Sequence, residues 1–283
     1  MPGSRSRWGD GARRLGTCKE RFVKFDVRLI VRRLALAAVT LWALMLHVTA
    51  DDAKSPRLHV VSFGLWGDQN LFKREAVAAA DAIASHYGRL GQLIVRTNSL
   101  TRSAGRIPDL RDALHGLAST IDRQEDILFL FLTSHGNQEG LAVKTFDSDK
   151  VFVLSPERLG GMLRVTGIRY RVVVISACYS GVFAEQIADD NTLVITAADA
   201  NHSSFGCNVD NAGNWTYFGQ AFFADSLKPG RSLDEAFQNA KARVSDREQT
   251  EKLLGSNPQM KGGAAVRAQI ARLKPALENR NRN

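Results

Sequence analysis

Two residues, His135 and Cys178, have the side chains of a general base and a nucleophile and occupy similar places in the sequence. His135 follows the apolar run 127–132 and a Thr-Ser pair, and Cys178 follows the apolar run 171–176 and Ala177. A thiol needs a base to become a thiolate at neutral pH, and a leaving amine needs a proton. One imidazole can do both, so this pair could perform acyl transfer.

Each candidate residue also lies near a glycine, Gly136 or Gly181. Glycine lets a substrate approach the backbone closely because it carries no Cβ. We predict that the backbone amides of Gly136 and Cys178 hold the developing oxyanion. A helix is predicted just after Cys178, and its dipole would favour a thiolate.

Taken alone, each feature has a simpler explanation, since a cysteine after a buried strand is often only a small hydrophobe. Two reactive side chains at equivalent strand ends favour catalysis. The main alternative is a binding module in which the pair no longer works, and thiol reactivity distinguishes the two.

The elements that would position the pair alternate between short apolar runs and segments with apolar residues at helical spacing, which predict strands and helices. This alternation predicts an α/β fold in which a mostly parallel central sheet is covered by helices on both faces. The carboxyl ends of parallel strands share one edge, where open α/β sheets bind ligands. The expected strands are 58–63, 93–95, 126–133, 171–176 and 192–196, and a hairpin is expected at 141–154. Helices are expected at 70–87, 108–123, 218–227 and 232–245. Two more are expected, one that begins at residue 156 and one that follows the strand 171–176 and ends at about residue 188.

Four ordered blocks resemble the legumain family of cysteine peptidases (peptidase family C13, in the caspase-like clan). Residues 135–140 (His-Gly-Asn-Gln-Glu-Gly) resemble its His-Gly-x-x-Gly, and residues 176–181 (Ser-Ala-Cys-Tyr-Ser-Gly) resemble its Ala-Cys-Glu-Ser-Gly. Residues 196–207 are similar to its Thr-Ala-Ala-Asn block that ends in Ser-Ser-Tyr-Ala-Cys, and residues 215–220 to its Thr-Tyr-Leu-Gly-Asp.

The resemblance covers roughly residues 57–248. It implies a caspase-like three-layer sandwich and a cysteine-type endopeptidase with His135 and Cys178 as its catalytic pair. Caspases themselves would have Gln-Ala-Cys-x-Gly around the nucleophile, and this sequence does not.

The resemblance also implies a substrate pocket that includes Tyr179, Ser203, Ser204 and Gln220. In legumains, acids at the positions of Tyr179 and Gln220 help to read an asparagine side chain, and the glutamate before the two serines is His202 here. Strict specificity for asparagine is therefore not expected. The two serines match pocket-wall positions, although solvation of a loop explains them equally well.

Motifs of other enzyme classes are missing from the sequence, which has neither the Gly-x-Ser-x-Gly nucleophile elbow nor the Gly-x-x-x-x-Gly-Lys-Ser/Thr phosphate loop. No cluster of metal ligands is evident, so we expect no metal and no cofactor. The expected partner is a peptide or protein substrate. A transamidase stays open as an alternative, because an amine can take the acyl group in place of water. The oligomeric state is left open.

The net charge of +9 is concentrated at the N-terminus, where residues 1–33 hold ten Lys/Arg and three acids. The remainder carries about +2, so the globular part has no nucleic-acid footprint and no nucleic-acid partner is expected. The 44% hydrophobic and 24% charged residues are typical of a globular protein.

An uncharged run at 34–48 follows the basic tail and ends in Val-Thr-Ala before two aspartates, which resembles a secretory signal peptide. It is shorter than the ~20 residues that span a bilayer as a helix. A retained anchor and a buried helix are the alternatives. The signal peptide and the retained anchor both place the catalytic domain outside the cytosol, in the periplasm or outside the cell. In both cases the chain contacts the membrane only through this segment.

The predicted organisation is a basic N-terminal region with a signal peptide or anchor at 1–50, a peptidase domain at 51–248 and a polar helical tail at 249–283. Three cysteines are too few for a disulfide scaffold. A bridge between Cys178 and Cys207 would block the nucleophile, and nothing in their spacing demands it.

Overall fold

The computed structural model describes residues 55–87, 90–208 and 213–273. The chain divides into two units, Met1–Ala53 and Lys54–Asn283. The first unit, with the predicted signal peptide or anchor, lies outside the described residues. Among the helices that are described, none combines the length and the apolar character needed to cross a bilayer.

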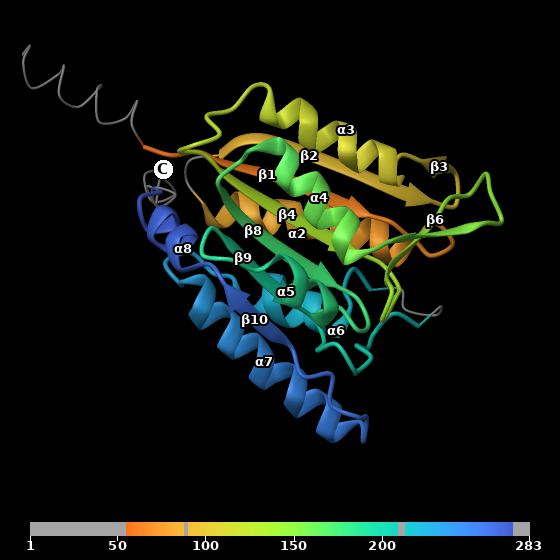
Figure 1. The fold of residues 1–283 in the computed structure, drawn as a ribbon. Helices are drawn as coiled ribbons and strands as arrows, with labels where there is room; N and C mark the ends of the chain where they lie inside the picture. Colours follow the sequence, from red (N-terminus) through yellow and green to blue (C-terminus); the bar gives the residue numbers. More distant parts are fainter. Residues whose placement is uncertain (1–54, 88–89, 209–212, 274–283) are drawn as a thin grey trace, which may run out of the picture. The chain divides into compact units, whose positions relative to one another are not determined.

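The second unit is built around a seven-stranded sheet in its described residues (Figure 1). The strands are β1 (Leu58–Gly64), β2 (Leu90–Ser99), β3 (Arg102–Ser103), β4 (Ile127–Thr133), β8 (Tyr170–Ser176), β9 (Thr192–Thr196) and β10 (Gln259–Gly262). Their order across the sheet is β10-β9-β8-β4-β1-β2-β3. The five inner strands are parallel, and the edge strands β3 and β10 are antiparallel to their neighbours.

Helices cover both faces of this sheet (Figure 1). One face carries α3 (Ile107–Ala118), α4 (Pro156–Thr166) and α5 (Gly181–Ile187). The other carries α2 (Asn70–His86), α6 (Tyr217–Gly219), the π-helix η1 (Gln220–Ser226), α7 (Leu233–Thr250) and α8 (Ala264–Ala271). The predicted α/β fold, with a mostly parallel sheet between two helical layers, is confirmed.

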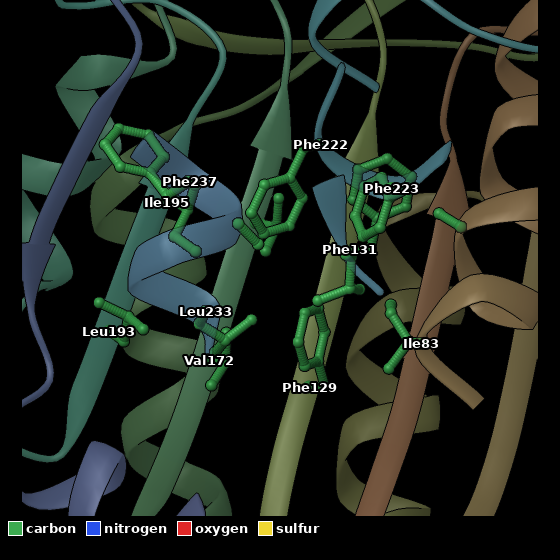
Figure 2. Packing of buried hydrophobic residues seen from close by; sticks show 14 of the residues in the cluster. Ile83, Phe129, Phe131, Val172, Leu193, Ile195, Phe222, Phe223, Leu233 and Phe237 are labelled. Atoms are coloured by element: carbon green, nitrogen blue, oxygen red, sulfur yellow. The ribbon is translucent and has the colours of Figure 1, made fainter. Parts of the chain in front are cut away.

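The apolar runs in the sequence are continuous because both faces of the inner strands are buried. In β4, Phe129 and Phe131 pack on one side and Leu128 and Leu130 on the other, all without exposed surface. Figure 2 shows the first of these layers, in which the ring of Phe131 lies 4.8 Å from that of Phe223 in η1. This rigid core fixes where β4 and β8 end.

A second, three-stranded antiparallel sheet follows the end of β4 and consists of β5 (Gly136–Asn137), β6 (Gly140–Lys144) and β7 (Val151–Leu154). The pairing of β6 with β7 confirms the predicted hairpin at 141–154. Gly140 turns the chain with φ +141°, where a Cβ would lie 2.3 Å from the Leu154 carbonyl oxygen.

The predicted boundary at residue 248 does not coincide with the end of the fold. Instead of a separate polar tail, residues 259–262 form β10 beside β9, and Val266 and Leu273 are buried in the core. The side chains of β10 are half-buried or exposed because it is an edge strand. Its composition is therefore polar, and the sequence shows no apolar run there.

Candidate active site

The ends of β4 and β8 bring the predicted catalytic pair to one edge of the sheet. The two strands are parallel neighbours, and Thr133 is paired with Ser176 in their register. His135 and Cys178 each lie two positions beyond this pair, on the carboxyl side. A Cβ on Gly136 would lie 2.6 Å from the carbonyl oxygen of Cys178, so the two turns are in close contact.

The His135 ring is held by residues that precede and begin α2. Its Nε2 lies 2.9 Å from Oε1 of Gln69, and the rings of Trp66 and Phe72 meet it edge-on, each with centroids 4.9 Å apart. Burial lowers the pKa of His135, which favours the neutral imidazole. Gln69 Nε2 donates to the Cys207 carbonyl at 3.4 Å, which orients the amide so that Gln69 Oε1 accepts a hydrogen bond from His135 Nε2. His135 Nε2 therefore carries the proton, and His135 Nδ1 is the basic nitrogen.

The Cys178 thiol lies beneath the loop 202–207. Its Sγ donates to the Ser204 carbonyl at 3.4 Å, and the Ser204 hydroxyl lies 3.9 Å from the sulfur. The hydrogen bond from the Cys207 thiol is the largest cause of a lowered pKa at Cys178, and Ser204 and Ser203 add to it against the opposing effect of burial. The pKa of Cys207 is correspondingly raised by its hydrogen bond to Cys178 and by burial.

Both cysteines of the described residues are free thiols, so the bridge considered from the sequence is not formed. α5 begins three residues after Cys178 and is only seven residues long. The predicted helix after Cys178 is therefore present but short, and the lowered pKa of the thiol is attributed to hydrogen bonds from Cys207, Ser204 and Ser203.

The two amides predicted to hold an oxyanion, those of Gly136 and Cys178, have no acceptor among the described residues. The amide of Ala142 donates to the His135 carbonyl, so Gly136 and Leu141 form a non-hydrogen-bonded pair of the β5–β6 ladder. The Gly136 amide is thus left out of that ladder. The Cys178 amide donates no hydrogen bond to any described residue. Both donors are available to a substrate carbonyl.

The imidazole and the thiol form no hydrogen bond with each other across the described residues. Catalytic hydrogen bonds are often long in structures without substrate and shorten in the complex. The shared edge and the basic Nδ1 therefore fit a pair that closes on the substrate.

Of the four predicted pocket residues, three lie around the nucleophile. Ser203 and Ser204 contribute hydrogen bonds to the Cys178 thiol. Tyr179 adopts φ +55° and donates its amide to the carbonyl of His202 at 2.9 Å. Gln220 is exposed at the start of η1, and no contact of its side chain with the nucleophile is present in the described structure.

Sequence reasoning missed Gln69, Glu75 and Cys207 as parts of this site. Glu75 had a signal, because a charged residue stands on the apolar face of a helix, between Phe72 and Ala79. Cys207 also had a signal, because it ends the third block that resembles the legumain family, whereas Gln69 lies 66 positions from His135 and had none. The described residues contain no cluster of three or more His, Cys, Asp or Glu side chains that could hold a metal ion.

Comparisons with known proteins give a family and a distant structural likeness. A search of curated proteins finds no match. Among solved structures, the chain is similar to caspase-1 from Spodoptera frugiperda, with a TM-score of 0.49, 9% identity, and coverage of 74% of this chain and 87% of that chain. The family model of the peptidase C13 family matches residues 112–263, which include both strand ends and the loop over the thiol. The chain belongs to the peptidase C13 family.

Proposed function

We propose that this protein is a cysteine endopeptidase in which Cys178 is the nucleophile and His135 is the general acid and base. The observation that carries the proposal is the pairing of Thr133 with Ser176, because it puts an imidazole and an acidified thiol at one strand edge. Membership of the C13 family supports peptidase chemistry in general.

In the proposed reaction, His135 Nδ1 takes the proton of the Cys178 thiol as sulfur attacks the peptide carbonyl carbon. The amides of Gly136 and Cys178 hold the resulting oxyanion. The imidazolium then gives its proton to the leaving amine, and a thioester remains on Cys178. His135 next takes a proton from water, which attacks the thioester and releases the carboxylic acid and the thiol.

Peptides that vary the residue before the cleaved bond test this proposal. We expect cleavage after more than one residue type, because Tyr179 and Gln220 stand where acids would read asparagine in legumains. The measurement is cleavage of a peptide library and labelling of Cys178 by the matching electrophilic probes. Cleavage after asparagine alone would contradict the expected specificity.

The same assay separates the alternatives. A chain that no probe labels is a binding module rather than an enzyme. If an added amine takes the acyl group and water does not, the protein is a transamidase. Hydrolysed product together with a labelled Cys178 supports the endopeptidase.

We also propose that residues 1–50 direct export, so that the enzyme acts in the periplasm or outside the cell. Support comes from the basic tail and the uncharged run at 34–48. Intact-mass measurement of the exported protein is expected to find residues 1–50 removed. A retained N-terminus in a membrane fraction would show an anchor instead, and the full chain in the cytosol would sink the proposal.

A further inference from the structure

Glu75 is a fully buried acid on α2, and its carboxylate lies beside the strand ends that lead to the proposed catalytic pair. Its Oε2 accepts a hydrogen bond from the Thr133 hydroxyl. Its Oε1 accepts from the Thr216 amide at 3.1 Å and from the Thr216 hydroxyl at 2.7 Å. The Thr216 hydroxyl also lies 2.9 Å from the hydroxyl of Ser176, so the network reaches a third segment.

These partners belong to three segments, which we name the base segment (133–136), the nucleophile segment (176–179) and the pocket segment (216–220). Glu75 reaches the first and third directly and the second through Thr216. Each segment carries at least one residue of the proposed site: His135 lies two positions after Thr133, Cys178 two after Ser176, and Gln220 four after Thr216.

The pocket segment is shaped around this carboxylate. A Cβ on Gly219 would lie 1.9 Å from Glu75 Oε1, so only glycine allows this approach. The oxygen of the Thr216 hydroxyl accepts a hydrogen bond from the Gly219 amide at 3.0 Å. The proton of the Thr216 hydroxyl is donated to Glu75. The Ser176 hydroxyl then donates to Thr216, and the chain of donors runs toward the acid.

A buried carboxylate is costly unless its oxygens accept hydrogen bonds. Burial raises the pKa of Glu75, and the hydrogen bonds from Thr133 and Thr216 act in the opposite direction. The dependence is mutual, because without the acid the buried Thr133 hydroxyl and Thr216 amide would lose their acceptor. An apolar residue at this position on α2 would fill the space without joining the segments.

We propose that Glu75 is a positioning residue that holds the base, nucleophile and pocket segments in one arrangement and thereby sets the reactivity of Cys178 toward peptides. The inference rests on the proposed peptidase function for its effect on acyl transfer. Without the carboxylate, the core keeps the sheet folded, but the three segments move independently. The thiol stays accessible to a small alkylating reagent, while attack on a peptide carbonyl loses its geometry.

The test compares Glu75→Ala and Glu75→Gln with the wild type in the full chain. We expect Glu75→Ala to lower the rate of labelling by a peptide electrophile by about 100-fold, as a small misplacement of reacting groups does. Alkylation of Cys178 by iodoacetamide should change by less than about threefold, because it needs only the thiolate. Glu75→Gln should recover most of the peptide labelling, because its amide oxygen accepts from Thr216 and its NH2 donates to Thr133.

Ser62→Ala is the matched control. Ser62 is also fully buried, and its hydroxyl donates to the Ala76 carbonyl of α2 at 2.6 Å, a hydrogen bond that includes no residue of the three segments. The two variants are compared in peptide labelling and in melting temperature. If both lose the same amount of melting temperature and the same amount of peptide labelling, Glu75 is only structural and the inference is overturned. If Glu75→Ala does not fold, Thr133→Val replaces it in the test. This variant should lose peptide labelling by a smaller factor than expected for Glu75→Ala, again with little change in alkylation by iodoacetamide.

Hydrogen exchange separates this inference from the proposed function. In Glu75→Ala, the amides of all three segments should exchange faster together, while those of α3 keep their protection. That result supports the anchoring role even if no peptide probe labels the wild type, in which case the peptidase proposal alone fails. Faster exchange confined to α2 would overturn the inference about Glu75.

Discussion

Replacing Cys178 with alanine is expected to abolish peptide cleavage and probe labelling while the protein stays folded. The expected loss in kcat is about 10⁴-fold or more, because no acyl-enzyme forms without the thiol. The thiol is only partly buried under the loop 202–207, and neither helical layer depends on it. Cleavage assays, intact mass after probe treatment and thermal melting check this prediction.

Cys207→Ala is its matched control, because Cys207 is the other free thiol of the described residues and lies in contact with the first. This variant should remain active. The pKa of Cys178 should rise, since the Cys207 hydrogen bond is the largest cause of its lowering, so alkylation of Cys178 should require a higher pH than in the wild type. Loss of activity in Cys207→Ala with activity retained in Cys178→Ala would reverse the assignment of the nucleophile.

His135→Ala is expected to lower kcat by about 1,000-fold, within the usual contribution of a general acid–base residue. Burial lowers the pKa of His135, so the imidazole is neutral at neutral pH and ready to take the thiol proton. Activity should fall as acid converts it to imidazolium, at a pH below the ordinary histidine range. The kcat of each variant across pH measures both effects.

Two comparisons make this prediction specific. Gln69→Ala should cost only about tenfold, because it removes the hydrogen bond that orients the ring and leaves the base in place. His115→Ala, on the exposed side of α3, should leave kcat unchanged. A His135→Ala enzyme with normal kcat would mean that another group is the base.

The inner strands, and the placement of His135 and Cys178 at their ends, could be predicted from the sequence because each depends on a local pattern. A strand buried on both faces is an apolar run, and His135 and Cys178 directly follow two of them. Only their neighbouring positions in the sheet had to be assumed, and the β4–β8 register confirms that assumption.

The supporting residues could not be predicted in the same way. Gln69 is 66 positions from His135, and its role follows from how α2 packs against β4. Only three residues of β2, at 93–95, were recognised, because the strand has half-exposed and exposed side chains over most of its ten residues. The specificity of the pocket could not be predicted from the sequence either, since it depends on how the loop 202–207 folds over the thiol.

The position of β10 affects how this protein can be shortened or recombined with members of its family. The residues just before β10 contact the loop that follows β9 and continues over the Cys178 thiol: the Asp199 amide donates to the Ser256 carbonyl at 3.0 Å, and the Asn257 side chain donates to Asp199 at 3.0 Å. A chain shortened at residue 248 would lose these contacts and uncover the edge of β9. The smallest unit that keeps these contacts therefore extends at least to Leu273, and chimaeras joined earlier would contain His135 and Cys178 without the support of the loop over the thiol.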